Sequence, residues 1–266
     1  MPAELSSILL RSAVAIALLM TAVWLESLRR RDASIVDLFW GAGFVLVAWT
    51  SFYSANSFSS GGRYDVILLP ILTTVWGSRL SLYLLWRNHR KPEDFRYRAM
   101  RKKWGNSFPL VSLLSVFGVQ GLVMWVVSLP LQAGVVGAFR SVPLFWIGVV
   151  LFAVGLLFES VGDWQLARFK LDESNSNRVL DTGLWRYTRH PNYFGDFVVW
   201  WGLFLISVAQ SGVWWTVVGP VVMSIFLMKI SGVTLLEKSL LKNKPKYADY
   251  VARTNAFFPG PPRNAG

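Results

Sequence analysis

Long runs of apolar residues, separated by short segments that carry most of the charge, dominate this sequence of 266 residues. Residues 110–139 contain no charged side chain, and a helix needs only about 20 apolar residues to cross a bilayer. The pattern predicts an all-α integral membrane bundle of seven transmembrane helices. The predicted spans cover residues 12–28, 35–53, 66–86, 109–130, 143–164, 191–209 and 213–234.

The connections between these runs indicate one domain. The sixth and seventh runs meet at residues 210–212, so we expect a tight helical hairpin there. Residues 29–31 are all Arg, and Arg11 is the only base before the first run, which is typical of a retained anchor and not of a cleaved signal peptide. No Pro-, Gly- or Ser-rich linker separates two folded units, so residues 1–266 are expected to form a single membrane domain. Its cytoplasmic end, residues 235–266, should extend the last span or lie along the membrane surface.

Composition and charge limit the classes of function that this chain can have. The chain is 53% hydrophobic and 16% charged and has no cysteine, which excludes a disordered tail, a disulfide scaffold and a cysteine-ligated metal site. Of its 27 Lys and Arg residues, 22 fall in alternate loops, and only Arg63 and Arg140 fall in the opposite loops. By the positive-inside rule, the N-terminus lies outside and the C-terminus lies in the cytoplasm, as in a protein of the bacterial inner membrane. This arrangement accounts for the net charge of +12 without nucleic acid, and the loops hold no recognisable nucleic-acid module.

Several ionisable residues fall inside the predicted spans, where a charge is costly unless it faces a polar cavity or a partner. Glu159 and Asp163 are four residues apart and share a helix face, as Asn192 and Asp196 do in the sixth span. We expect these faces to line one polar site that opens to the cytoplasm. The alternative is that the charges form structural ion pairs or reach to the interface. The complete set is Asp37, Arg79, Glu159, Asp163, Asp196 and Lys229.

Residues 186–196 contain the highest density of charged and polar side chains with possible chemical roles in the chain. Pro191 has the fixed φ that suits the first turn of a helix, so we expect the sixth span to begin at His190 or Pro191. A helix N-terminus offers free N–H groups and a positive dipole end, and Arg186 and Arg189 add two bases beside it. These features predict a site for phosphate or carboxylate. The alternative is a juxtamembrane cluster that contacts anionic lipid.

The run DTGLWRYTRHPNYFGDFVVWWG, residues 181–202, resembles the C-terminal half of the steroid 5α-reductase superfamily. Within it, RHPNYFGD is similar to the signature of the sterol C14-reductases. The resemblance covers residues 146–259 and extends to a group of bacterial membrane proteins of unassigned function in that superfamily. Weaker similarity is present in DLFWGAGF at residues 37–44 and WGSRLSLYLLWR at residues 76–87.

This resemblance implies a seven-helix membrane reductase that transfers a hydride from NADPH to a carbon–carbon double bond conjugated to a carbonyl. The expected substrate is an apolar lipid or a steroid-like enone, and no metal is expected. By matching positions, the resemblance implies that the cofactor is contacted by Asp163, Lys170, Arg189, His190, Asn192, Tyr193 and Asp196. We expect the cofactor site to be completed by Arg79, Glu159, Arg186, Lys229 and Glu237.

The expected catalytic residues are Asp37 and Trp76. Steroid 5α-reductases hold the substrate carbonyl with a Gln-Glu pair in an early span and a Tyr in the third span. In this chain the nearest acid is Asp37, and Trp76 stands in place of that Tyr. A Trp N–H donates one hydrogen bond but supplies no proton. The hypothesis is therefore that a protonated Asp37 polarises the carbonyl, which burial would favour.

Two other functions remain open. Isoprenylcysteine-type and phospholipid methyltransferases, which bind S-adenosylmethionine, also carry an Arg-His-Pro-x-Tyr-x-Gly segment. They end in a helix with a Glu and a Tyr-rich stretch, to which Glu237 and residues 247–250 are similar. The third possibility is a non-catalytic membrane protein that keeps the fold. Asn192, Asp196 and the matching run of residues 159–170 favour the reductase.

Overall fold

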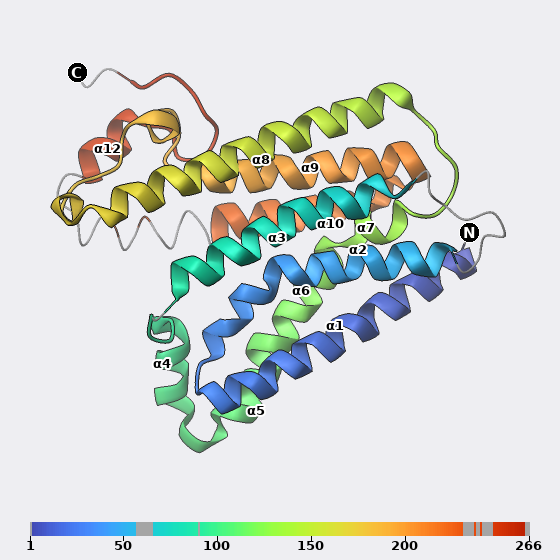
Figure 1. The fold of residues 1–266 in the computed structure, drawn as a ribbon, viewed down its shortest axis with the longest axis horizontal. Helices are drawn as coiled ribbons and strands as arrows, with labels where there is room; N and C mark the ends of the chain where they lie inside the picture. Colours follow the sequence, from blue (N-terminus) through green and yellow to red (C-terminus); the bar gives the residue numbers. More distant parts are fainter. Residues whose placement is uncertain are drawn as a thin grey trace. The chain divides into compact units, whose positions relative to one another are not determined.

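The computed structural model describes residues 2–56, 66–89, 91–230, 237, 240 and 247–263 of the chain. Every regular element among these residues is a helix (Figure 1). Contacts divide the chain into two compact units, Met1–Phe145 with Ile206–Gly219, and Trp146–Leu205 with Pro220–Gly266. The boundaries fall inside helices and not in exposed linkers, where domain boundaries are usual. A single membrane domain therefore stays a prediction.

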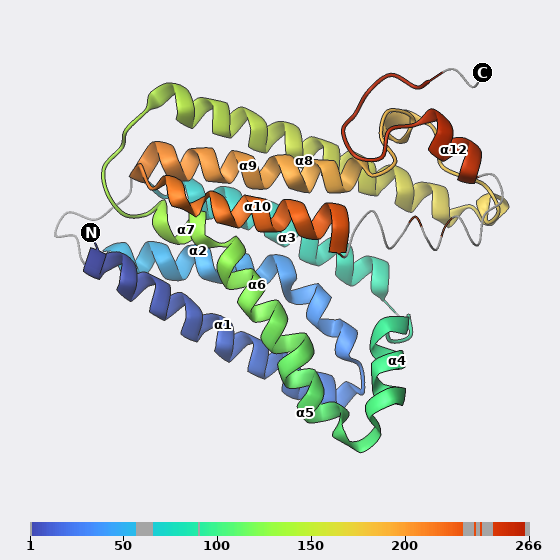
Figure 2. The ribbon, with the colours of Figure 1, turned by 180° about the vertical axis from the view of Figure 1, so that it is seen from behind.

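The first unit contains most of the N-terminal helices. α1 and α2 lie side by side in both views of the fold (Figures 1 and 2). The elements are α1 (Pro2–Arg30), a 3-10 helix (Ala33–Phe39), α2 (Trp40–Asn56), α3 (Leu68–Asn88), α4 (Phe95–Trp104), a 3-10 turn (Gly105–Ser107), α5 (Phe108–Ser112), a π-helical segment (Leu113–Gly118), α6 (Val119–Val127) and α7 (Leu129–Ala133).

The second unit is built on α8 and α9, which lie side by side in Figures 1 and 2. The elements that follow α7 in the chain are α8 (Val142–Leu171), 3-10 helices at Glu173–Asn175 and Gly183–Arg186, α9 (Pro191–Ser211), a 3-10 helix (Trp214–Val217), α10 (Val218–Ile225), a π-helical segment (Phe226–Ile230) and α12 (Tyr247–Arg253).

The helices confirm a multi-pass integral membrane protein. In the described part of the chain, six helical stretches are long and apolar enough to cross a membrane, and each overlaps one of the first six predicted spans. The predicted seventh span, residues 213–234, corresponds to the shorter apolar stretch Trp214–Lys229, and residues 231–234 lie outside the described part of the chain. The predicted hairpin before it is present, since Gly212 has a φ of 74° that suits glycine. The six long helices are Ala3–Arg30, Ala33–Ala55, Leu68–Asn88, Phe95–Val127, Val142–Leu171 and Pro191–Ser211.

The basic segment between the third and fourth predicted spans contains a helix that the apolar pattern did not reveal. This helix, α4, begins after Asp94, whose side chain accepts a hydrogen bond from the Arg96 N–H at 2.9 Å. It ends at Gly105, where φ is 49°. The three bases of its last turn suit the negative end of the helix dipole. Capping and charge placement therefore stabilise a helix that is too polar to be recognised by hydrophobicity.

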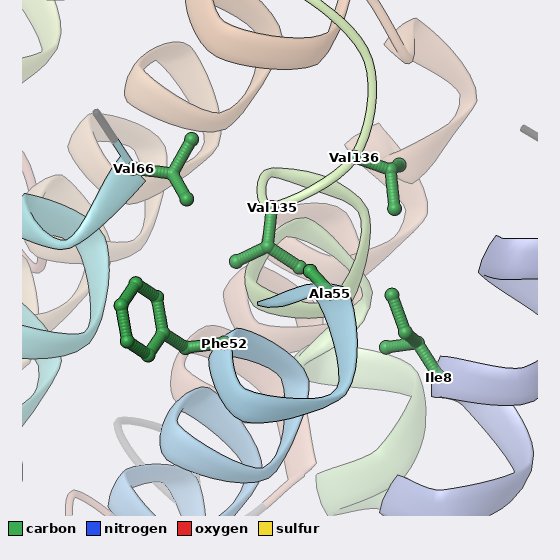
Figure 3. Close-up of a cluster of buried hydrophobic side chains, with 6 residues drawn as sticks. All are labelled: Ile8, Phe52, Ala55, Val66, Val135 and Val136. Atoms are coloured by element: carbon green, nitrogen blue, oxygen red, sulfur yellow. The ribbon is translucent and has the colours of Figure 1, made fainter. Parts of the chain in front are cut away.

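A small apolar cluster in the first unit joins α1 to the end of α2 (Figure 3). Ile8 of α1 and Phe52 of α2 are at most 3% exposed. Val66 stands before α3, and Val135 and Val136 follow α7, and all three are completely buried. Burial of side chains of this size stabilises by roughly 1.5–3 kcal/mol each in water. This cluster therefore fixes the ends of three helices and the segment after α7.

Glycines seven residues apart allow α8 and α9 to pack closely. Gly148, Gly155 and Gly162 recur along α8, and Gly195 and Gly202 recur along α9. A Cβ added to Gly195 would lie 2.6 Å from the Gly155 carbonyl oxygen, and one added to Gly202 would lie 2.7 Å from that of Gly148. Small residues at such positions let membrane helices approach at backbone distance.

The last glycine of this series seats the beginning of α9. A Cβ on Gly162 would lie 3.1 Å from the Asn192 amide nitrogen and 3.2 Å from Pro191 Cγ. The first turn of α9 therefore packs directly on α8. The glycine-lined contact of α8 and α9 therefore leads directly to the polar residues at the beginning of α9.

Candidate functional site

The helix start predicted at residue 190 or 191 is confirmed, since α9 begins at Pro191. The Thr188 hydroxyl accepts a hydrogen bond from the His190 N–H at 3.3 Å. The His190 carbonyl accepts the Phe194 N–H at 3.0 Å, which closes the first turn. Proline is well suited to this position because it has no N–H to leave unpaired.

Arg189 connects the start of α9 to the C-terminal segment. Its side chain is only 8% exposed, and its Nε lies 2.7 Å from Glu237 Oε1. Its Nη1 donates to the carbonyls of Val251 and Thr254. Its backbone N–H donates to the Asn255 carbonyl at 2.9 Å. Arg189 is thus both charge-paired and hydrogen-bonded within the protein, and its contacts give it a structural role.

Glu237 accepts contacts from both residues that precede Pro191. His190 Nε2 lies 3.2 Å from the same Oε1 atom that Arg189 approaches. Burial would raise the pKa of Glu237, but the hydrogen bonds from His190 and Arg189 outweigh it and lower the pKa to about 2. The carboxylate therefore stays ionised at neutral pH. Burial, together with the charge of Glu237, raises the pKa of Tyr247 to about 12.

A buried polar pair lies where α8 meets the beginning of α9. Asn192 Nδ2 donates to Asp163 Oδ1 at 3.1 Å, so the two polar helix faces expected from the sequence do meet here. Asp163 is 5% exposed, and Glu159, one turn earlier, is 3% exposed. Asn192 Oδ1 is buried and accepts no hydrogen bond from the described residues. This orphaned acceptor is suited to an external N–H or O–H donor, since a buried polar atom without a partner is costly.

Aromatic rings surround the same helix start. The Tyr193 ring stacks on His190 with centroids 5.6 Å apart and planes 10° from parallel. Phe194 and Phe197 of α9 contact Phe257 at centroid distances of 6.1 and 5.6 Å. The aromatic contacts of Phe194 and Phe197 therefore link the first turns of α9 to the C-terminal segment.

Glu237 was predicted to be part of the site, but residues 247–263 of the C-terminal segment were not. The Phe257 carbonyl accepts the Thr188 hydroxyl at 2.8 Å, and the Gly260 N–H donates to the Tyr187 carbonyl at 3.0 Å. The Tyr250 hydroxyl donates to the Trp185 carbonyl. Residues 247–263 therefore fasten onto the turn before α9. The sequence does hold one indication of this attachment. Two Phe residues and a Pro-Gly-Pro-Pro run follow a lysine-rich stretch, and such a composition is unusual for a free tail.

Asp37 belongs to the first unit and has neighbours that the sequence did not reveal. The Tyr97 hydroxyl donates to Asp37 Oδ1 at 3.3 Å, and Gln120 Nε2 donates to the Tyr97 hydroxyl at 3.2 Å. Arg96 Nη2 lies 3.5 Å from Asp37 Oδ2. Tyr97 is 7% exposed. A chain of hydrogen bonds therefore runs from Gln120 of α6 through Tyr97 of α4 to Asp37 of the 3-10 helix before α2.

Trp76 and Arg79 also belong to the first unit, on α3. Trp76 is completely buried, and its ring packs on Phe44 with centroids 5.7 Å apart. Arg79 is half-buried, and its Cζ lies 5.9 Å from the centre of the Tyr83 ring. Packing accounts for the position of Trp76, whereas its expected contact with substrate stays a prediction.

The remaining predicted site residues lie in the second unit. Asp196 is half-buried on α9. Lys170, Arg186 and Lys229 are exposed. No group of three His, Asp or Glu side chains among the described residues is placed to hold a metal ion. The structure thus brings together Arg189, His190, Tyr193 and Glu237, and separately Asp163 and Asn192.

Comparison with known proteins identifies the family to which this chain belongs. The profile of the family described as "Protein of unknown function (DUF1295)" matches residues 23–254, which include α9 and the polar residues around its start. The chain belongs to this family. This DUF1295 protein is also 24% identical over 268 residues to an uncharacterised protein of Schizosaccharomyces pombe, C594.04c, with 89% of this chain and 75% of the relative covered. No solved structure matches the DUF1295 chain.

Proposed function

We propose that this DUF1295 protein is a membrane-embedded, NADPH-dependent reductase of a conjugated carbon–carbon double bond in an apolar lipid or steroid-like enone. The proposal includes seven spans with the N-terminus outside, the C-terminus in the cytoplasm of a bacterial inner membrane, and a site that opens to the cytoplasm. It is supported by the resemblance of the α9 region to the steroid 5α-reductase superfamily and by the chemistry at the start of that helix.

The orphaned Asn192 Oδ1 is the observation that carries the proposal. A carboxamide, such as that of nicotinamide, can donate an N–H to Asn192 Oδ1. The neighbouring Asp163 holds the Asn192 amide in the orientation that presents this oxygen, through the 3.1 Å hydrogen bond. Asp163 is itself a second acceptor for an amide or hydroxyl of the cofactor. The residues present therefore fit the cofactor.

Two exposed bases suit the phosphates of a dinucleotide. Arg186 precedes α9 and Lys170 ends α8, and both side chains are exposed. Arg186 can form paired hydrogen bonds with a phosphate, and Lys170 can add a point charge. When bound, NADPH would supply the hydride for the reduction. Apolar helices around it would exclude water from the reacting carbon.

The first unit offers a hydrogen-bond donor for the substrate. A protonated Asp37 would polarise a substrate carbonyl, as the sequence resemblance implies. Tyr97 extends that proposal as a positioning residue, because its hydroxyl donates to Asp37 Oδ1 at 3.3 Å and so orients the carboxyl group. Gln120 holds the Tyr97 hydroxyl at 3.2 Å and thereby orients it.

A methyltransferase that uses S-adenosylmethionine is the second candidate, and one observation favours it. Arg189 was expected to bind phosphate, but its charge is paired with Glu237 at 2.7 Å. The start of α9 therefore carries less free positive charge than the sequence implied. S-adenosylmethionine has no phosphate and would not require that charge.

Titration of the purified full-length protein with NADPH, NADH and S-adenosylmethionine tests the proposal. We expect NADPH to bind most tightly of the three. Rising salt should lower its affinity, because salt screens the charges of Arg186 and Lys170. Asn192→Ala should weaken NADPH binding about tenfold, the effect of losing one hydrogen bond to a buried group. Asn177→Ala removes an exposed amide from the loop before α9 and serves as the matched control.

Two results would contradict the proposal. Tight binding of S-adenosylmethionine without binding of NADPH would replace the reductase with the methyltransferase. Unchanged NADPH affinity in Asn192→Ala would show that the cofactor does not contact this residue. Thermal melting of each variant would separate loss of binding from loss of folding.

A further inference from the structure

A half-open cavity lies in the first unit, where α9 turns into the last apolar stretch. Its volume is about 410 Å³, within the range of roughly 300–1,000 Å³ of small-molecule sites. Its wall combines one guanidinium and two hydroxyls with apolar side chains. The lining residues are Arg140, Ser141, Leu144, Val208, Ser211, Gly212, Val213 and Trp214.

Arg140 is the cation of this cavity. The described residues form no hydrogen bond or ion pair with its guanidinium, and only its backbone N–H is engaged, with the Ala209 carbonyl at 2.7 Å. The guanidinium stem lies beside Gly212, where an added Cβ would be 3.5 Å from Arg140 Nε. Arg140 and Arg63 are also the only bases in the loops that are predicted to lie on the outer side of the membrane. Its charge is therefore available to an external anion.

The cavity lies at the ends of two long apolar helices. The fifth long helix begins at Val142 and the sixth ends at Ser211, so Arg140 and Gly212 stand immediately outside the two spans. Trp214 is 60% exposed at the cavity wall, and the neighbouring Trp215 and Phe139 are also exposed. Aromatic side chains gather where a membrane protein meets the headgroup region.

We propose that this cavity binds the phosphodiester headgroup of an anionic phospholipid. The Arg140 guanidinium would hold the phosphate through paired hydrogen bonds, which its planar shape favours. The Ser141 hydroxyl, which accepts the Leu144 N–H at 3.3 Å, keeps its own proton for a phosphate oxygen. The acyl chains would lie against Leu144 and the Trp214 ring. The apolar half of the wall favours a lipid over a free anion, and the site is independent of the proposed reductase activity.

Three probes separate the parts of such a ligand. Dioctanoyl phosphatidylglycerol carries both chains and phosphate, dioctanoylglycerol carries the chains alone, and inorganic phosphate carries the anion alone. Each is titrated into the purified full-length protein in detergent, and bound species are counted by native mass spectrometry. We expect phosphatidylglycerol to bind at least about tenfold more tightly than either part, since a hydrogen bond to a charged group contributes that much.

Variants of the cavity wall complete the experiment. Arg140→Gln should weaken the binding of phosphatidylglycerol about tenfold. Arg140→Lys should weaken this binding less, because the charge remains. Arg178→Gln makes the same change in net charge at an exposed loop position and should leave binding unchanged. Leu144→Trp fills the cavity while keeping the charge, and should also reduce binding.

Three outcomes would overturn the proposal. The first is equal binding of phosphatidylglycerol to the wild-type protein, Arg140→Gln and Leu144→Trp. The second is binding of inorganic phosphate as tight as that of the lipid, which would indicate a site for a free anion. The third is binding of dioctanoylglycerol as tight as that of the lipid, which would remove any role for the phosphate.

Discussion

Replacing Gly195 with Ala would place a methyl group against the backbone of α8. The new Cβ would lie 2.6 Å from the Gly155 carbonyl oxygen and 2.8 Å from Glu159 Cα, whereas ordinary contact begins near 3.4 Å. Both neighbours are main-chain atoms of a helix, so no side chain can turn away. The Glu159 amide nitrogen would be closer still, so the two helices would have to separate by roughly 1 Å at this point to restore ordinary contact.

This separation allows the loss of stability to be worked out. Overpacking by one methyl group costs about 1–3 kcal/mol, and contact with main-chain atoms puts this site at about 2–3 kcal/mol. The higher helix propensity of Ala offsets about 1 kcal/mol of that. The net destabilisation is therefore about 1–2 kcal/mol. For a protein of this size, each kcal/mol lowers the melting temperature by about 2–4 °C. We expect a melting temperature about 2–8 °C lower for Gly195→Ala.

The assay is thermal melting of the purified protein in detergent, followed by NADPH titration. Ala153→Val is the matched control, because Ala153 is exposed on α8 two residues from Gly155 and the substitution adds more volume. It should shift stability by no more than about 0.5 kcal/mol. Separation of α8 from α9 should also lengthen the hydrogen bond between Asp163 and Asn192, and the affinity for NADPH should fall as a result. A Gly195→Ala protein as stable as Ala153→Val would refute the close packing of these helices.

Three further predictions concern charge, catalysis and topology. Because the pKa of Glu237 is lowered from 4.5 to about 2, its ionisation stabilises the fold fully above pH 4.5 and progressively less as the pH falls towards 2. Glu237→Gln should therefore melt below the wild-type protein at pH 7, and the gap should close between pH 4.5 and 2; a constant gap would contradict this reasoning. Asp37→Asn and Tyr97→Phe should each lower turnover of any enone substrate about a hundredfold without changing NADPH binding, and near-normal turnover in both would remove them from the mechanism. Since the chain has no cysteine, Phe139→Cys and Asn175→Cys can be labelled with an impermeant maleimide; we expect the first to react in intact cells and the second only after permeabilisation, and the reverse would invert the topology.

The sequence was sufficient for the features that depend on local composition. Lipid-spanning helices need long apolar runs, so the pattern located the first six correctly. Pro191 marked the beginning of α9 because its ring restricts φ and removes an N–H. The hairpin after α9 was also visible, because Gly212 interrupts two apolar runs that would otherwise touch.

Features that depend on distant residues were not predictable in this way. Arg189 looked like a free base beside a helix start, and only the fold shows Glu237 and the carbonyls of residues 251 and 254 around its guanidinium. The contact of Tyr97 with Asp37 joins residues that are 60 positions apart. A hydrophobic pattern carries no information on such pairs. It also overlooked α4, whose stability comes from a cap and from charge placement.

The attachment of residues 247–263 to the turn before α9 has a consequence for biogenesis. Arg189 obtains its hydrogen bonds from residues that are 62 and 65 positions later in the chain. During synthesis, the turn before α9 would emerge long before those partners exist. The start of α9 can therefore reach its final form only after residues 251 and 254 have been synthesised. A truncation before Tyr247 would leave the Arg189 guanidinium without two of its acceptors, so residues 247–263 belong to the assembly of this region as much as the membrane helices do.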